Sequence, residues 1–100
     1  MKTYPSHDDK ELISAFAQLK NAKEITSFLR DLLTAAEIEE FSRRFQIAKL
    51  LWTTHLSYLD IAQKAGTSTT TVTRVGQWLF KENWQGYSAV LTRMYGSSKR

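Results

Sequence analysis

A run of small hydrogen-bonding side chains lies in the second half of the chain, between two apolar segments. The run consists of Thr67, Ser68, Thr69, Thr70, Thr73 and Gln77, and Lys64 comes shortly before it. Hydroxyl and amide groups can pair with base edges, and a lysine can neutralise a phosphate. No acidic residue interrupts residues 61–81. The pattern therefore favours a nucleic-acid contact surface, which the neighbouring elements must hold in place.

Residues 57–80 are predicted to form two short helices joined by a tight turn. Ser57 and Asp60 have the spacing of a capping box, which starts a helix, and Gly66 suits the left-handed conformation that often ends one. The second helix is expected from about Thr69 to Phe80. Apolar residues at helical spacing would join the two helices: Ile61, Ala62, Val72, Val75, Gly76 and Leu79. This is the spacing of a helix-turn-helix, which places its second helix in the DNA major groove.

A plain helical hairpin is the competing interpretation, because such hairpins with a glycine turn are common and imply no ligand. Five threonines within residues 67–73 also favour strand by propensity. The 3.6-residue apolar period and the lack of a partner strand argue against a strand. The polar outer face of the second helix makes DNA binding the favoured interpretation.

Composition and charge restrict the class of protein. One hundred residues without cysteine predict a single domain without disulfides, in a cytoplasmic setting. No apolar run approaches the length of a membrane span, so no membrane partner is expected. The net charge is +4, and residues 51–100 carry all of the excess, with six basic residues against two acidic ones. A polyanion would therefore meet the half that contains the helix pair.

The remaining sequence predicts an all-α fold of about six helices. Further helix starts are marked by Ser6 with Asp9, Asn21 with Glu24 and Thr34 with Glu37. The expected helices cover about residues 8–19, the segment after Asn21, 35–53 and 87–95. The helix at 35–53 is apolar on more than one face, which predicts a central position. Residues 1–7 are expected to be a flexible arm, 8–95 the domain and 96–100 a polar tail.

A homodimer is expected from the amount of apolar surface. The first two helices and the last one carry more apolar side chains than a central helix pair can cover in a 100-residue monomer. One helix in a major groove also contacts too few base pairs for useful discrimination, which a two-fold dimer remedies.

Three segments at fixed distances resemble the Trp repressor family, and most closely its YerC/YecD-type members. They are residues 32–48 (LLTAAEIEEFSRRFQIA), residues 56–66 (LSYLDIAQKAG) and residues 71–74 (TVTR). The similarity covers about residues 10–95 without a gap between Leu33 and Leu79. The resemblance implies an intertwined helical homodimer whose helix-turn-helix binds a palindromic operator.

The resemblance also implies a co-repressor pocket at Thr34, Arg44, Thr71 and Arg74. An arginine can stack on an aromatic ring, and another can bind a carboxylate with its planar fork. Two positions depart from the family's tryptophan-responsive members, because Val75 and Trp78 stand where those members have small residues. We therefore expect a self-filled pocket in which Arg44 stacks on Trp78, and a regulator that does not respond to tryptophan. The alternative is a pocket for some smaller or differently shaped ligand, and any small-molecule effector is unknown.

An enzyme is the least favoured function. His7 and His55 stand alone, without metal-ligand spacing or a glycine-rich phosphate loop, so no metal and no cofactor are expected. The alternative to a DNA-binding repressor is a non-catalytic helical adaptor, or a transposase-type helix-turn-helix module without its own operator.

Overall fold

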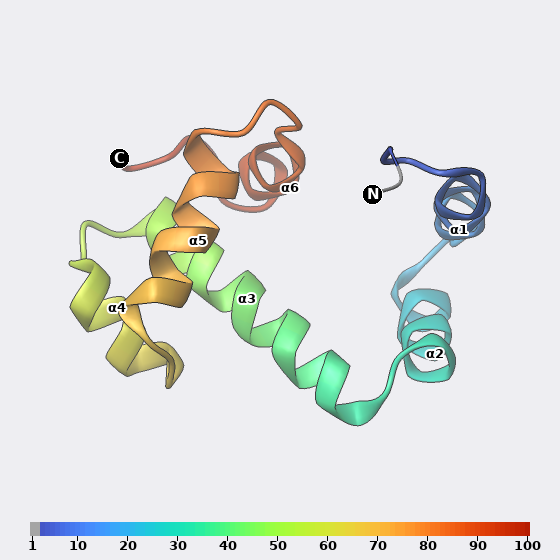
Figure 1. Ribbon diagram of the computed structural model, residues 1–100, viewed down its shortest axis with the longest axis horizontal. Coiled ribbons are helices and arrows are strands. Elements are labelled where there is room, and N and C mark those ends of the chain that lie inside the picture. Colours follow the sequence, from blue (N-terminus) through green and yellow to red (C-terminus); the bar gives the residue numbers. More distant parts are fainter. Residues whose placement is uncertain (1–2) are drawn as a thin grey trace. The chain divides into compact units, whose positions relative to one another are not determined.

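The computed structural model describes residues 3–100 and is all-helical over that range, which confirms the predicted fold class. The helices are α1 (His7–Ala17), α2 (Ala22–Leu32), α3 (Ala35–Thr53), α4 (Tyr58–Ala65), α5 (Thr69–Phe80) and α6 (Gly86–Tyr95) (Figure 1). None of these helices combines the length and the apolar character needed to cross a membrane. The observed bounds of α3 and α5 agree with the predicted ones, and α1 ends two residues earlier than expected.

Side-chain caps start most of the helices. Ser6 and Asp9 form a reciprocal box at α1, and Thr34 and Glu37 form another before α3, with bonds of 2.9 and 3.1 Å. At α4 only half of the predicted box is present: the Asp60 N–H donates to the Ser57 hydroxyl, without a return bond. Local hydrogen bonding therefore explains where the chain enters its helices.

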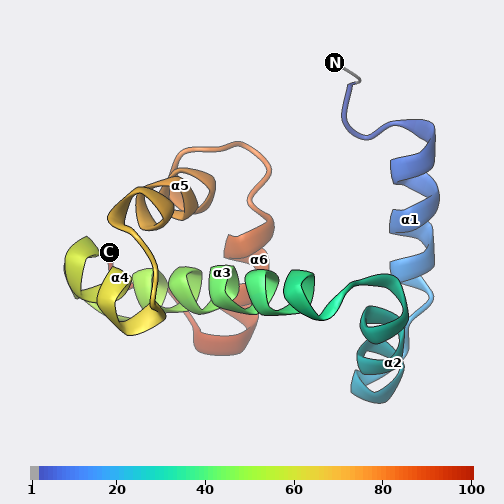
Figure 2. The same ribbon diagram turned by 60° about the horizontal axis from the view of Figure 1, so that its bottom comes forward.

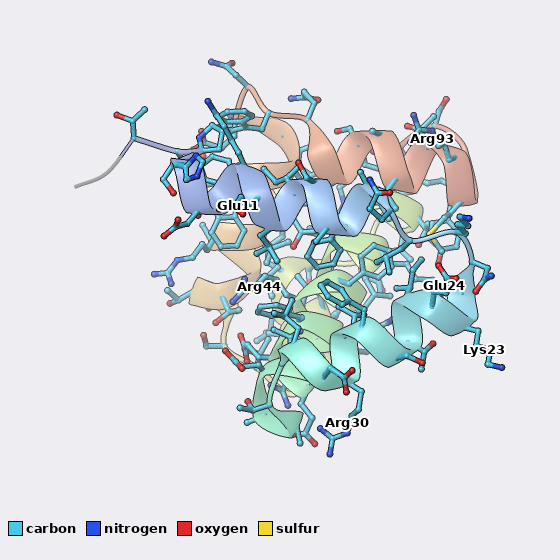
Figure 3. The ribbon with its side chains drawn as sticks, turned by 90° about the vertical axis from the view of Figure 1, so that its right-hand side faces the viewer. Glu11, Lys23, Glu24, Arg30, Arg44 and Arg93 are labelled. Carbon is cyan, nitrogen blue, oxygen red and sulfur yellow. The ribbon has the colours of Figure 1, made fainter. Side chains whose placement is uncertain are left out.

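The chain forms two compact units, which divide between Ile38 and Glu39 within α3. In the first unit neither α1 nor α2 contains a buried residue. Phe16 and Phe28 meet edge to face at 5.3 Å, and Lys23 and Arg30 project away from α2 (Figure 3). The large apolar residues of these helices that remain exposed are Leu12, Ile13, Phe16, Ile25 and Leu32. One chain therefore leaves this apolar surface uncovered.

Met1 and Lys2 of the predicted arm lie outside the described residues. Ser6 and His7 belong to the start of α1, as its N-cap and its first residue.

The second unit, residues 39–100, contains the core. In Figures 1 and 2, α4 and α5 lie side by side near the C-terminal end of α3, and α6 lies close to α3 and α5. The buried side chains are Ile47, Ala48, Leu51, Trp52, Ile61, Ala62, Val72, Val75, Leu79 and Leu91. Only the second half of α3 contributes buried side chains to this core, and Phe41 in its first half is 47% exposed. The core thus serves mainly to hold the α4–α5 pair.

Candidate nucleic-acid interface

The turn between α4 and α5 is defined by backbone hydrogen bonds. Gly66 adopts φ 68°, in the left-handed region that favours glycine. Its N–H donates to the Gln63 carbonyl at 3.3 Å, and the Thr67 N–H donates to the Ala62 carbonyl at 2.9 Å. These two bonds form a Schellman motif, which ends α4. Ser68 then caps α5, so that only residues 66–68 separate the two helices.

Buried apolar contacts fix the angle between α4 and α5. Ile61 of α4 and Val72 of α5 are fully buried, and Val75 is 1% exposed. Gly76 allows a close approach, because a Cβ placed there would lie 2.8 Å from the Tyr58 hydroxyl oxygen. The predicted helix-turn-helix is therefore present, and its second helix packs closely against the first.

The predicted contact residues lie on this helix pair, and their hydroxyl groups differ in availability. Thr69 and Thr70 are exposed at the start of α5, and their hydroxyls make no hydrogen bond within residues 3–100. The Ser68 hydroxyl accepts from the Thr71 N–H at 3.2 Å, and the Thr73 hydroxyl donates to the Thr69 carbonyl at 3.0 Å. Thr69 and Thr70 are thus the hydroxyls best placed to pair with another molecule.

The other predicted contact residues surround these two threonines. Lys64 is exposed in the last turn of α4, Gln77 is exposed on α5, and Thr67 is half-buried in the turn. α5 carries no acidic residue, and the positive end of its dipole lies at Thr69. The surface is therefore polar and free of negative side chains along α5, as a polyanion requires.

Arg44 contacts two aromatic rings. Its guanidinium carbon is 5.5 Å from the ring centroids of both Phe41 and Trp78, and its Nη2 lies 3.7 Å from a Glu40 carboxylate oxygen. The expected stacking of Arg44 on Trp78 is therefore present. Burial raises the pKa of the Tyr87 hydroxyl, and the positive charge of Arg44 opposes that rise.

The predicted pocket stays a prediction, and its other residues make the following contacts. Val75 is buried in the core, and Thr71 shares a hydrogen bond of 3.1 Å with Ser68. Thr34 belongs to the first unit, where it forms the box with Glu37. Arg74 is exposed and makes no ion pair or hydrogen bond within the described residues. Thr71, Arg74, Val75 and Trp78 follow one another at i, i+3, i+4 and i+7, so they lie along one side of α5.

Sequence reasoning missed Tyr58 and Arg100. Tyr58 packs against Gly76, and the Arg100 guanidinium carbon lies 6.0 Å from the centroid of the Tyr58 ring. The sequence carried a signal for the Tyr58 contact, because Gly76 lies in the interior of α5 and such a glycine often marks the close approach of another group to the backbone. Nothing in the local sequence around Arg100 indicates its partners.

The fold and this site define an all-helical helix-turn-helix protein. The family described as Trp repressor protein matches residues 8–95, so the chain belongs to the Trp repressor family. It is 31% identical over 84 residues to the uncharacterized protein YerC of Bacillus subtilis, a match that spans 84% of this chain and 79% of YerC.

Two solved structures share the fold. A TrpR-like protein from Eubacterium eligens has a TM-score of 0.77 and 38% identity, over 90% of this chain and 91% of that one. A candidate Trp repressor from Staphylococcus aureus has a TM-score of 0.80 and 34% identity, over 93% and 91%. The resemblance found in the sequence is confirmed, and the family is one of regulators with a helix-turn-helix, not of enzymes.

Proposed function

We propose that this protein is a transcriptional repressor that binds a palindromic DNA operator as a homodimer through α4 and α5. The observation that carries the proposal is the pair of free, exposed hydroxyls of Thr69 and Thr70 at the start of α5. Side chains at the N-terminal end of the second helix are the ones that reach base edges in this motif. The acid-free face of α5 and the nearby Lys64 support contact with the phosphate backbone.

The first unit supports the homodimer. Its two helices bury no side chain in a single chain, and the apolar residues that they leave exposed form a surface typical of an interface. A second copy would cover that surface and bring a second α5 to the other half of the operator. Sedimentation equilibrium is expected to give twice the 11.5 kDa chain mass at micromolar concentration, whereas a folded monomer would contradict the proposal.

The contacts of Arg44 support a regulator that does not need tryptophan. The resemblance would assign the Arg44 guanidinium to stacking on the ligand's indole. This guanidinium already makes cation–π contacts with Phe41 and Trp78. A free indole would have to displace Trp78 to make the same contact. The helix pair would then be held ready for DNA without a co-repressor.

Selection of bound sequences from a random DNA pool tests the proposal. We expect a palindromic consensus, and a binding constant that falls steeply with salt as phosphate contacts release counterions. A flat salt dependence would favour a helical adaptor. A steep dependence without sequence preference would favour a module that binds DNA without its own operator.

A matched pair of variants shows whether α5 is the contact surface. Gln77→Glu adds one negative charge to the exposed face of α5 and is expected to weaken operator binding about tenfold or more, because like charges would face each other. Gln18→Glu makes the same change at the C-cap of α1 and is expected to leave binding unchanged. Equal loss in both variants would show that only net charge matters.

A further inference from the structure

Residues 96–100, expected to be a polar tail, are bound to the C-terminal end of α3. The Trp52 indole N–H donates to the Gly96 carbonyl at 2.7 Å, and the Lys99 N–H donates to the Trp52 carbonyl at 2.9 Å. The last carbonyls of a helix have no partner within the helix, so they must find one elsewhere. This segment supplies such a partner to Trp52 and anchors itself to the indole ring at the same time.

Arg100 makes the most extensive contacts of the segment. Its Nε donates to the Leu51 carbonyl at 2.7 Å, and its Nη2 donates to the Leu56 carbonyl. The first carbonyl lies in the last turn of α3, and the second lies in the connection between α3 and α4. A single guanidinium therefore holds together the two sides of the bend that leads into the helix-turn-helix. The negative end of the α3 dipole strengthens this binding.

Tyr58 extends these contacts to α5. It is the first residue of α4, and the centroid of its ring lies 6.0 Å from the Arg100 guanidinium carbon. Its hydroxyl packs against Gly76 in the middle of α5. Contacts therefore run from α3 through Arg100 and Tyr58 to the helix that carries Thr69 and Thr70.

We propose that Arg100 is a positioning residue, which fixes the α4–α5 pair on α3 and so sets the direction in which α5 faces DNA. The effect of Arg100 on DNA contact rests on the proposed function, whereas the fixing of the α4–α5 pair on α3 does not. Two donors of Arg100 already bind carbonyl oxygens, so its role differs from that of a lysine or arginine that binds phosphate.

Hydrogen exchange on the DNA-free protein tests the structural part. Arg100→Ala is expected to speed exchange of the amides between Thr54 and Ile61 by roughly tenfold, because two charge-assisted hydrogen bonds are lost. Lys99→Ala is the matched control: it removes the same charge one residue away, and it keeps the backbone N–H that binds Trp52. Unchanged exchange in Arg100→Ala, or an equal increase in Lys99→Ala, would overturn the inference.

Arg100→Lys keeps the charge and protects the test against a variant that fails to fold. An ammonium group lacks the planar fork that reaches both carbonyls, so exchange is expected to rise by an intermediate factor of roughly threefold. If Arg100→Lys exchanges at the wild-type rate while Arg100→Ala exchanges fast, the positive charge alone is sufficient. That result would overturn the inference that two hydrogen bonds of Arg100 position the helix pair.

DNA binding tests the consequence. Arg100→Ala is expected to weaken binding to the selected operator roughly three- to tenfold while leaving the slope of the salt dependence unchanged. A loss of a phosphate contact would instead reduce that slope by about one, and would contradict the inference. If the wild-type protein binds no DNA, the proposed function fails, and the exchange experiment still decides whether Arg100 positions the helix pair.

Discussion

Gly76→Ala tests how closely α4 and α5 pack. Alanine in place of glycine in a helix interior stabilises by about 1 kcal/mol. Here the new methyl would lie 2.8 Å from the Tyr58 hydroxyl oxygen, and inserting a methyl into a tight contact costs about 1–3 kcal/mol. The two effects oppose each other, so we expect a net loss of free energy of unfolding of up to about 2 kcal/mol.

Tyr58→Phe separates the two effects. Without the hydroxyl, the nearest ring atom is Cζ, which lies 3.5 Å from the added methyl, an ordinary contact. The Tyr58 hydroxyl makes no hydrogen bond within residues 3–100, so its removal alone costs little. In the Tyr58→Phe background Gly76→Ala should therefore stabilise by about 0.5–1 kcal/mol, which gives a coupling energy of about 1–3 kcal/mol between the two positions.

Urea unfolding of the four proteins at one fixed concentration measures this cycle, since the stability of a dimer depends on concentration. Gly86→Ala is the control glycine, because no heavy atom lies within 4 Å of a Cβ built there. Gly86→Ala should change the free energy of unfolding by the same amount whether residue 58 is Tyr or Phe. A coupling below about 0.5 kcal/mol at Gly76 would refute the packing described for the helix pair.

Three further predictions concern DNA contact, ligand and pH. Thr69→Ala and Thr70→Ala should each reduce discrimination between operator and random DNA by about 1–3 kcal/mol. Lys64→Ala should weaken binding to both DNAs and lower the slope of the salt dependence by about one. Equal losses for all three variants in competition gel shifts would mean that this face of α5 is only electrostatic. Calorimetric titration with L-tryptophan should show no heat, because Trp78 occupies the stacking position on Arg44, and saturable binding of one ligand per subunit would disprove this. The pKa of Glu37 lies below its ordinary value, chiefly because of a hydrogen bond with the Thr34 backbone and secondly because of one with the Thr34 side chain. The ionised carboxylate therefore stabilises the fold at pH values above the ordinary glutamate pKa. This contribution is lost as the pH falls through the lowered pKa of the folded protein. Glu37→Gln should therefore lose less stability than wild type between neutral and acidic pH in urea unfolding, and identical pH profiles would contradict the cap.

The starts and ends of the helices could be predicted because their causes lie within a few residues. Thr34 and Glu37 are three positions apart, and Gly66 ends α4 through its own backbone conformation. The 3.6-residue period likewise shows which residues share a helix face, so the α4–α5 pair and its outward threonines followed from the sequence. The amount of apolar surface led to the expectation of a dimer, and family resemblance added that of a ligand pocket.

The tertiary structure decided which of those faces are covered and which side chains meet. Phe41 shares a helical stripe with buried residues, yet it is 47% exposed and stacks on Arg44. Val75 and Trp78, one turn apart on α5, separate into the core and the surface. Arg100 reaches the carbonyl of Leu51, 49 positions away along the chain. Such contacts depend on how distant helices pack, and periodicity within one helix carries no information about its neighbours.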